Sequence, residues 1–274
     1  MKKNLVIAAA VDLQIEQIIL FIKSLRKYYK GDICFVIGFN NHELEIELKK
    51  YQVIIIKTKI KKKAIQFRRY EIILDFLKTK NYDNVLCSDS RDIYFQSNPF
   101  NFNYEGEINF FLEDKKINEC PFNTNWILKT YGKRDYESIG NKTILCSGTV
   151  LGKQKKIEEY LKILINNISK YKYKKKLKYF LTFRIDPEGR GCDQGHANYL
   201  VHKNLIKDFH FYTNKKGPIA TVFHLDEIIF NKNNELINEL NEPYIIVHQY
   251  DKKWDKFKTN VNQIRRQLGL NQII

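Results

Sequence analysis

The chain has 274 residues, a formal net charge of +16 and five cysteines. Hydrophobic residues make up 43% and aromatic residues 14% of it, which excludes a disordered chain, and a core of this size needs no disulfide or structural metal. The cysteines form no Cys-x-x-Cys pair, so we expect reduced, mostly buried thiols rather than a zinc knuckle. The apolar run at 5–11 is too short to span a bilayer and precedes no cleavage site, which predicts a soluble, cytoplasmic protein.

The first 100 residues alternate between predicted strands and predicted helices. Short apolar runs predict the strands, and apolar residues at helical spacing predict the helices. Strands that alternate with helices in this way favour βαβ units, so we expect a Rossmann-like, mostly parallel sheet flanked by helices. The predicted strands cover residues 5–10, 33–37, 53–56 and 84–87, and the predicted helices cover 13–29, 43–51 and 64–78.

Beyond Pro99 the pattern changes to a mixed set of shorter elements. No internal repeat and no Pro/Gly/Ser-rich linker interrupts the chain, which favours one α/β domain over residues 1–274. We expect a tail or a helix at 251–274. The predicted strands cover 108–112, 143–151, 209–212, 220–223 and 244–248, and the predicted helices cover 123–131, 155–168 and 193–202.

A polar cluster at 88–92 follows the predicted strand 84–87. In an open α/β sheet, ligands bind beyond the carboxyl ends of the strands. Two carboxylates on one tight turn, Asp89 and Asp92, suit a hard divalent cation, which in turn neutralises a diphosphate. The same residues also suit a turn in which Asp and Ser side chains only cap backbone groups. The cluster therefore indicates either a metal site or a structural turn.

The segment NVLCSDSRDIYFQSNPF, residues 84–100, resembles the aspartate motif of nucleotide-sugar-dependent glycosyltransferases of the GT-A fold, in particular those that build bacterial surface glycans. That motif is usually D-x-D. If Asp92 matches its last aspartate, the first falls on Ser90, and Asp89 lies one position earlier. The resemblance therefore implies Asp92 as a metal ligand, with Asp89 either beside it on the metal or holding the ribose or a water on the ion.

Two further segments are similar to parts of the same family. The string CSGTVLG at 146–152 is similar to a small-residue strand, in which Gly148 lets a sugar approach the backbone; a packed strand is the alternative. The string GCDQGHAN at 191–198 is similar to a D-Q-x-x-x-N helix start. The resemblance implies that Asp193 and Gln194 contact the sugar, although Asp193 also suits a helix N-cap.

A last segment, YIIVHQYDKK at 244–253, ends a predicted strand at His248. A neutral imidazole beside carboxylates is a good ligand for manganese. The family often supplies a late histidine of this kind, with a lysine just beyond it that meets the diphosphate. The resemblance thus implies His248 as a third metal ligand and Lys252 or Lys253 at the diphosphate.

The implied activity is metal-dependent transfer of a sugar from a nucleoside diphosphate sugar, with uridine diphosphate as the favoured carrier, to a hydroxyl of a glycan or lipid-linked acceptor. Mn²⁺ or Mg²⁺ is the implied cofactor. Residues 1–100 would form the nucleotide-binding half and residues 101–250 the acceptor and catalytic half. Arg68, Arg69 and Arg91 are candidates for the nucleotide. In an inverting enzyme Asp193 would be the general base; in a retaining enzyme Asp193 or Gln194 would stabilise the reacting sugar or orient the acceptor.

The basic excess leaves other interpretations open. Basic runs at 57–63 and 170–178 suit an anionic membrane surface on the inner leaflet, and a bias towards lysine in an AT-rich genome also explains them. A nucleic-acid-binding protein is disfavoured, because the sequence has no RNP-type aromatic motif and no zinc finger. A nucleotidyltransferase would carry a Gly-rich loop after the first strand, where this chain has Ala8 to Asp12. The imperfect D-x-D also allows a catalytically inactive relative.

Overall fold

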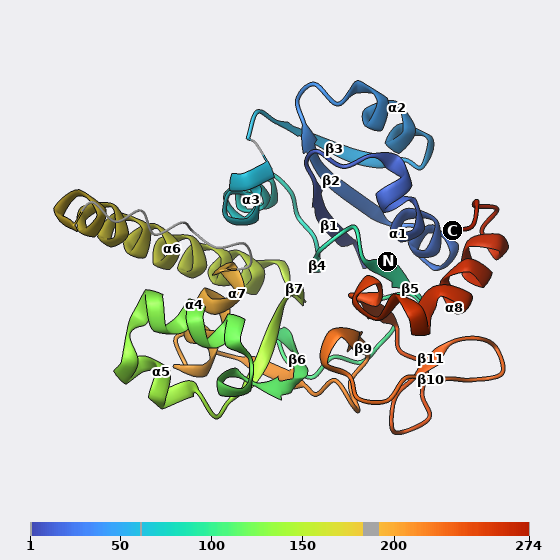
Figure 1. Ribbon diagram of the computed structural model, residues 1–274. Coiled ribbons are helices and arrows are strands. Elements are labelled where there is room, and N and C mark those ends of the chain that lie inside the picture. Colours follow the sequence, from blue (N-terminus) through green and yellow to red (C-terminus); the bar gives the residue numbers. More distant parts are fainter. Residues whose placement is uncertain (1, 61, 183–191, 274) are drawn as a thin grey trace.

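The computed structural model describes residues 2–60, 62–182 and 192–273, without the side chains of 62–64 and 172–182. An α/β protein is confirmed: a seven-stranded, mostly parallel sheet lies between helices, with two small sheets in the C-terminal third (Figure 1). The large sheet has the strand order β3-β2-β1-β4-β7-β6-β8. Its strands are β1 Asn4–Ala10, β2 Asp32–Gly38, β3 Val53–Thr58, β4 Asn84–Ser88, β6 Ile108–Lys116, β7 Thr143–Lys153 and β8 Phe209–Tyr212.

The small sheets and the helices complete the fold. One small sheet has the order β5-β12-β9, and the other pairs β10 with β11. These strands are β5 Ile93–Phe95, β9 Ile219–Thr221, β10 Ile229–Phe230, β11 Leu236–Ile237 and β12 Ile246–His248. The α-helices are α1 Ile15–Tyr28, α2 His42–Lys50, α3 Lys62–Leu77, α4 Pro121–Tyr131, α5 Lys133–Ile139, α6 Gln154–Thr182, α7 Cys192–His202 and α8 Trp254–Gln267.

Strand β7 is the exception in the large sheet, because it runs antiparallel to both of its neighbours, β4 and β6. Strands β4 and β6 therefore run in the same direction, and β1 is parallel to β4. The carboxyl ends of β1, β4 and β6 consequently meet at one edge of the sheet. This is the edge at which open α/β sheets bind ligands.

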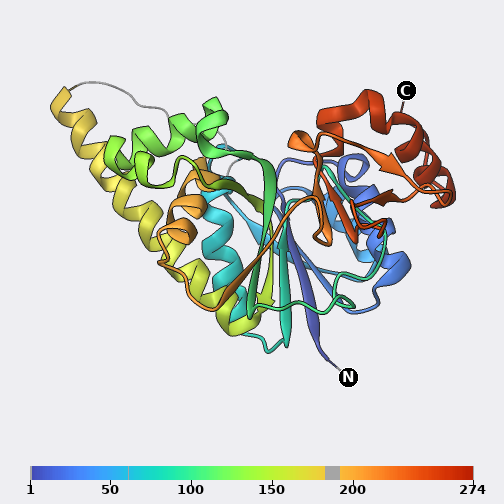
Figure 2. The same ribbon diagram turned by 90° about the horizontal axis from the view of Figure 1, so that it is seen from below.

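Both faces of the sheet are buried, as Figure 2 shows, with α3 and α6 on one side and α1 on the other. Alternate residues of β1 supply the two cores: Leu5 and Ile7 contact one cluster, and Val6 and Ala8 contact the other. Alternation of this kind follows from the two-residue period of a strand. Because both faces of β1 are buried, its sequence is a continuous apolar run rather than an alternation of apolar and polar residues.

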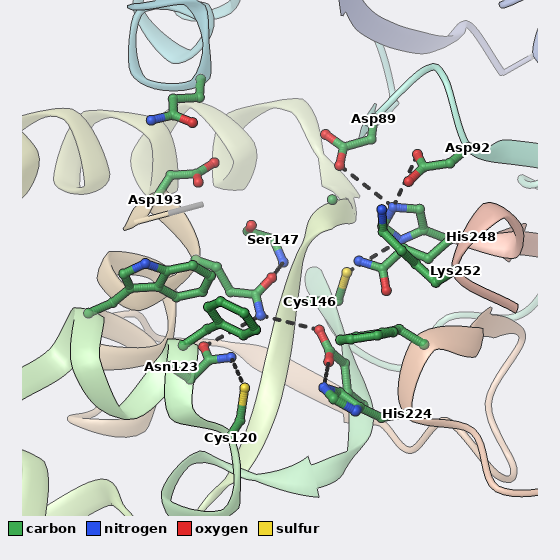
Figure 3. Close-up of a pocket in the computed structure, with 18 of the residues that line it drawn as sticks. Asp89, Asp92, Cys120, Asn123, Cys146, Ser147, Asp193, His224, His248 and Lys252 are labelled. Carbon is green, nitrogen blue, oxygen red and sulfur yellow. Dashed lines mark hydrogen bonds and ion pairs between the residues drawn. The ribbon is translucent and has the colours of Figure 1, made fainter. Parts of the chain in front are cut away.

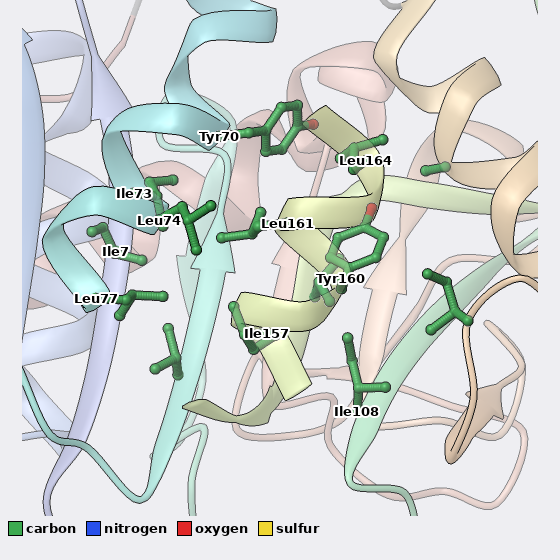
Figure 4. Close-up of a cluster of buried hydrophobic side chains, with 14 of the residues drawn as sticks. Ile7, Tyr70, Ile73, Leu74, Leu77, Ile108, Ile157, Tyr160, Leu161 and Leu164 are labelled. Atoms are coloured by element: carbon green, nitrogen blue, oxygen red, sulfur yellow. The ribbon is translucent and has the colours of Figure 1, made fainter. Parts of the chain in front are cut away.

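Helices α3 and α6 pack on the sheet through matching apolar stripes (Figure 4). Residues three and four apart lie on the same face of a helix, so each stripe buries one face and leaves the other to solvent. A fully buried Leu or Ile side chain contributes about 1.5–3 kcal/mol to stability. The stripes are Tyr70, Ile73, Leu74 and Leu77 on α3 and Ile157, Tyr160, Leu161 and Leu164 on α6.

The C-terminal third departs most from the expected elements. The predicted strands at 220–223 and 244–248 are shorter, since β9 gives way to a 3₁₀ helix at Val222–His224 and β12 covers Ile246–His248. The segment after 251 forms the helix α8, one of the two expected forms. Strands β10 and β11 had no prediction. Outside this third, strand β5 and helix α5 had none either, and α6 continues well past residue 168.

The two basic runs lie partly outside the described residues. In the run 57–63, residue 61 and the side chains of 62 and 63 are not described; in the run 170–178 the side chains from 172 onwards are not. Lys57 pairs with Glu45 at 2.5 Å. No helix within the described ranges has both the length and the apolar character required to cross a bilayer.

Candidate functional site

A cavity of about 460 Å³ opens at the carboxyl edge of the large sheet (Figure 3). Its lining comes from the turn between β4 and β5, from β6, β7 and β12, from the helices α3, α4 and α7, and from the 3₁₀ helices Val222–His224 and Tyr250–Lys253. The cavity contains nine of the eleven residues that the sequence singled out. These are Arg69, Asp89, Arg91, Asp92, Gly148, Asp193, Gln194 and His248, together with Lys252, while Arg68 and Lys253 lie outside it.

Asp89, Asp92 and His248 form what we call the acidic triad, and backbone pairing brings them together. Asp89 follows β4, and its N–H donates to the Gly148 carbonyl at 2.8 Å. Asp92 precedes β5, which pairs with β12 so that Ile93 lies opposite His248. The Gln249 N–H then donates to the Asp92 carbonyl at 2.8 Å. The turn at 89–92 and the end of β12 are distant in sequence, and they meet because the pairing of β5 with β12 fixes their register.

The geometry of the acidic triad suits a shared divalent cation. His248 Nε2 lies 3.6 Å from Asp89 Oδ2 and 3.7 Å from Asp92 Oδ1, beyond hydrogen-bond range. This nitrogen is buried and has no hydrogen-bond partner among the described residues, which is costly for a polar atom. Ligand atoms on one ion with bonds of about 2.1 Å lie up to about 4.2 Å apart, so these separations fit an ion between them. The donor set, two carboxylates and one imidazole, suits Mn²⁺.

Charge within the acidic triad is unevenly distributed. Burial opposes ionisation of Asp89, but Arg69 and His248 outweigh it and hold the pKa of Asp89 below its ordinary value. Burial raises the pKa of Asp92. Burial alone would lower the pKa of His248, yet Cys146 and the two carboxylates raise it above its ordinary value. A cation would reverse this last effect, because metal binding requires a neutral imidazole and displaces its proton.

Cys146 orients the His248 ring. Its Sγ lies 3.4 Å from His248 Nδ1, within the range of a hydrogen bond to sulfur, and both side chains are buried. A proton held on Nδ1 leaves Nε2 with a free lone pair that faces the carboxylates. Metal-binding histidines generally have such a partner on the second nitrogen. Cys146 was assigned only to the small-residue strand, so this contact was not predicted.

Gly148 lines the cavity and lies directly against the acidic triad. A Cβ at this position would overlap the His248 ring and would stand 2.7 Å from Asp89 Oδ2. Side chains of any size are therefore excluded here. The glycine serves a close approach, as the sequence indicated, but its described neighbours are two of the candidate metal ligands.

Substituting Gly148 by Ala is expected to lower the affinity for Mn²⁺ at least tenfold, because the methyl group forces His248 and Asp89 apart. Overpacking of this kind costs about 1–3 kcal/mol of stability. Gly38→Ala is the matched control, since the nearest atom to its added Cβ is 3.9 Å away. Titration of Mn²⁺ by electron paramagnetic resonance, with thermal unfolding of each variant, tests both effects. Equal Mn²⁺ affinities in the two variants would contradict the expectation.

Arg69, on α3, joins the acidic triad to the opposite wall of the cavity. It donates to Asp89 Oδ1 at 2.5 Å and to Asp193 Oδ2 at 2.9 Å. The Tyr70 hydroxyl donates to the same Asp193 oxygen at 2.7 Å. Asp193 is almost fully buried, so both donors are needed to offset the loss of water around its charge. Asp89 consequently directs one oxygen to Arg69 and the other to His248.

The D-Q-x-x-x-N segment combines a structural residue with two cavity residues. Asn198 accepts a hydrogen bond from the Leu145 N–H at 2.8 Å and donates to the Leu145 carbonyl at 2.9 Å, which fixes α7 on β7. Asp193 and Gln194, in the first turn of α7, then face the cavity. Gln194 donates to Glu113 Oε1 at 3.2 Å.

The predicted cationic residues divide into two groups. Arg91 pairs with Asp251 at 2.8 Å and, like Lys252, lines the cavity. Arg68 points to solvent and pairs with Glu71 at 2.9 Å. The Lys253 amine donates to the Leu225 carbonyl. Arg68 and Lys253 are therefore poorly placed to meet a ligand in this cavity.

Glu113 and His224 also line the cavity and were not selected from the sequence. Burial raises the pKa of Glu113 to about 7 and lowers the pKa of His224 to about 4. Their side chains meet at 3.4 Å, so between these pH values they meet as neutral groups rather than as an ion pair. Glu113 directly follows the predicted strand 108–112. Its position just after the predicted strand was the available signal, and the same signal had identified Asp89, although β6 itself continues to Lys116.

The titration of Glu113 should appear in stability measurements. The folded protein binds a proton at Glu113 more tightly than the unfolded chain does, so this contribution is complete below pH 4.5 and is lost as pH rises to about 7. The wild type should thus lose about 3 kcal/mol relative to Glu113→Gln over this range. Urea unfolding of both proteins from pH 4.5 to 7.5 isolates the effect of Glu113. The contribution of His224 is present in both proteins and cancels in the difference. Parallel stability curves would show that Glu113 does not titrate in this way.

Comparisons with known proteins do not name a family for this chain. A search of known protein families finds no match, and a search of curated proteins finds none either. What the cavity binds must therefore be inferred from its own residues.

Proposed function

We propose that this protein is a metal-dependent glycosyltransferase of the GT-A type. It would move a sugar from a nucleoside diphosphate sugar, with uridine diphosphate as the favoured carrier, to a hydroxyl of a glycan or lipid-linked acceptor. The observation that carries the proposal is the acidic triad, in which a buried histidine nitrogen without a partner faces two carboxylates. The motif resemblance at 84–100 and the position of the triad at the carboxyl edge of the sheet support the same activity.

In this proposal Asp89, Asp92 and His248 hold the metal. When bound, a divalent cation neutralises charge on the diphosphate and makes it a better leaving group. Arg91 and Lys252 lie on the same part of the cavity lining and add positive charge that favours a diphosphate. Both side chains are more than two-fifths exposed, so they can turn towards a ligand without leaving a buried site.

Asp193 is better suited to electrostatic stabilisation than to proton abstraction. Its Oδ2 already accepts from Arg69 and from Tyr70, and removing that charge would leave Arg69 without one of its two partners. A fixed carboxylate of this kind stabilises the positive charge that develops on a sugar ring at the reacting carbon. Gln194, beside it, offers an amide for sugar hydroxyls.

The proposal is tested by binding and then by turnover. Mn²⁺ affinity is measured with and without uridine diphosphate, and release of nucleoside diphosphate is followed for a panel of uridine and guanosine diphosphate sugars. We expect tighter Mn²⁺ binding with the nucleotide and turnover that stops on addition of a chelator. A protein that binds neither Mn²⁺ nor a nucleoside diphosphate contradicts the proposal. A protein that binds both and cleaves no donor is a catalytically inactive relative.

A further inference from the structure

Another part of the cavity lining carries aromatic rings that the core does not fully bury. Phe122 and Trp126, one turn apart on α4, have ring centroids 6.2 Å apart. Phe122 is 63% exposed, and Phe223, from the 3₁₀ helix Val222–His224, is 41% exposed. All three line the same cavity. Apolar rings exposed at a cavity, rather than scattered over the surface, indicate a binding surface.

Buried hydrogen-bonding groups lie beside these rings. Glu113 and Asn123 are each at most 3% exposed. Gln194 donates to Glu113 Oε1 at 3.2 Å and lies 3.5 Å from Asn123 Oδ1, so one amide joins both groups. His224 contacts the other oxygen of Glu113 at 3.4 Å. Figure 3 shows Asn123 and His224 on the far side of the cavity from Asp89 and Asp92.

We call Phe122, Trp126, Phe223, Glu113 and Gln194 the aromatic end of the cavity. A pyranose ring has apolar C–H faces and an equatorial rim of hydroxyls, and it requires both types of surface at once. Aromatic faces pack on the C–H groups, while carboxyl and amide groups bond the hydroxyls. A phosphate group would instead meet the carboxyl of Glu113, which repels an anion when ionised.

We propose that the aromatic end is a subsite for an uncharged sugar ring of the acceptor, with Phe122, Trp126 and Phe223 packing on the ring and Glu113 and Gln194 bonding its hydroxyls. The assignment of this sugar as acceptor rests on the proposed glycosyltransferase activity. It places the acceptor across the cavity from the acidic triad and assigns a role to five residues, four of which the sequence did not select.

The chain offers an internal probe, because it contains only two tryptophans, Trp126 and Trp254. Trp254 begins α8 and does not line the cavity. In a Trp254→Phe protein all tryptophan fluorescence comes from Trp126. Titration with methyl glycosides of glucose, galactose and mannose, and with lactose and maltose, should shift this emission for at least one sugar. If none of these sugars changes the emission, the proposal fails.

Variants then test the individual contacts in the Trp254→Phe background. Phe122→Ala and Phe223→Ala should each raise the Kd of the bound sugar about tenfold, since an aromatic contact of this kind is worth roughly one factor of ten. Leu128→Ala is the matched control on the same helix, because it also removes an exposed apolar side chain but does not line the cavity. Equal Kd values for the three variants would overturn the assignment.

Failure of the subsite proposal can be distinguished from failure of the proposed function. Mn²⁺ and uridine diphosphate binding are measured on the same variants and should be unchanged in Phe122→Ala and Phe223→Ala. With an active donor, these variants should raise KM for the acceptor about tenfold while donor hydrolysis in the absence of acceptor keeps its rate. Absence of nucleotide binding in the wild type would contradict the proposed glycosyltransferase activity. Normal acceptor KM in both variants, with an active wild type, would count against this subsite alone.

Discussion

Asp92→Asn is expected to lower the affinity for Mn²⁺ about 100-fold or more and to abolish metal-dependent cleavage of a sugar nucleotide. An amide oxygen keeps the shape of the side chain but loses its charge, and the charge of a carboxylate supplies most of its attraction for a divalent cation. The fold should be preserved, because burial raises the pKa of Asp92 and a neutral group therefore suits its surroundings. Electron paramagnetic resonance gives the Mn²⁺ affinity, and thermal unfolding gives the stability.

Asp75→Asn is the matched control for this variant. It makes the same chemical change on α3, at a side chain that is 74% exposed and pairs only with Lys78 among the described residues. His248→Gln should reproduce the loss seen with Asp92→Asn, since it removes the third ligand. Wild-type Mn²⁺ affinity in Asp92→Asn would remove the acidic triad as a metal site, and with it the main support for the proposed function.

Arg69→Met should destabilise the protein by about 3 kcal/mol and also weaken Mn²⁺ binding about tenfold. Removing one member of a buried ion pair leaves an uncompensated charge, here on Asp193, which is only 5% exposed. The second effect arises because Arg69 holds one oxygen of Asp89 and so orients the other towards His248. Urea unfolding and Mn²⁺ titration measure the two effects separately.

The neighbouring residue supplies the control. Arg68→Met makes the same change one position earlier on α3, where the side chain is half-exposed and pairs with Glu71, and it should cost less than 1 kcal/mol. Adding Asp193→Asn to Arg69→Met should recover much of the lost stability, because it removes the unpaired charge. Equal stabilities for Arg68→Met and Arg69→Met would show that Arg69 does not hold the carboxylates of Asp89 and Asp193 in place.

The fold was largely predictable because its signals are local. The seven strands of the large sheet all coincide with predicted apolar runs, and α3 and α6 follow from apolar residues three and four positions apart. The small sheets were less predictable. Strand β5 has only three residues, and its pairing with β12 depends on a partner more than 150 residues away. No local pattern specifies such a pairing.

The candidate site was predictable where a strand end or a motif identified a residue. It was not predictable where only a three-dimensional contact determines whether a residue lines the cavity. Asp89 and Asp92 follow a strand, and His248 ends one. Nothing local distinguishes Arg69, which lines the cavity, from Arg68, which does not; the 100° turn between consecutive helical residues separates them. Phe122 and Phe223 resemble core residues in the sequence, because apolar composition does not report exposure.

The acidic triad also spans two parts of the architecture. Asp89 extends from the seven-stranded sheet, whereas His248 belongs to the three-stranded sheet, and more than half of the chain lies between them. An ion held by both would crosslink two segments that the pairing of Ile93 with His248 already brings together, and its binding energy would add to the stability of the folded form. Backbone amides of β9 and β12 would then exchange with solvent more slowly when metal is supplied. The pairing of β5 with β12 already attaches the C-terminal third, and bound metal would make this attachment firmer.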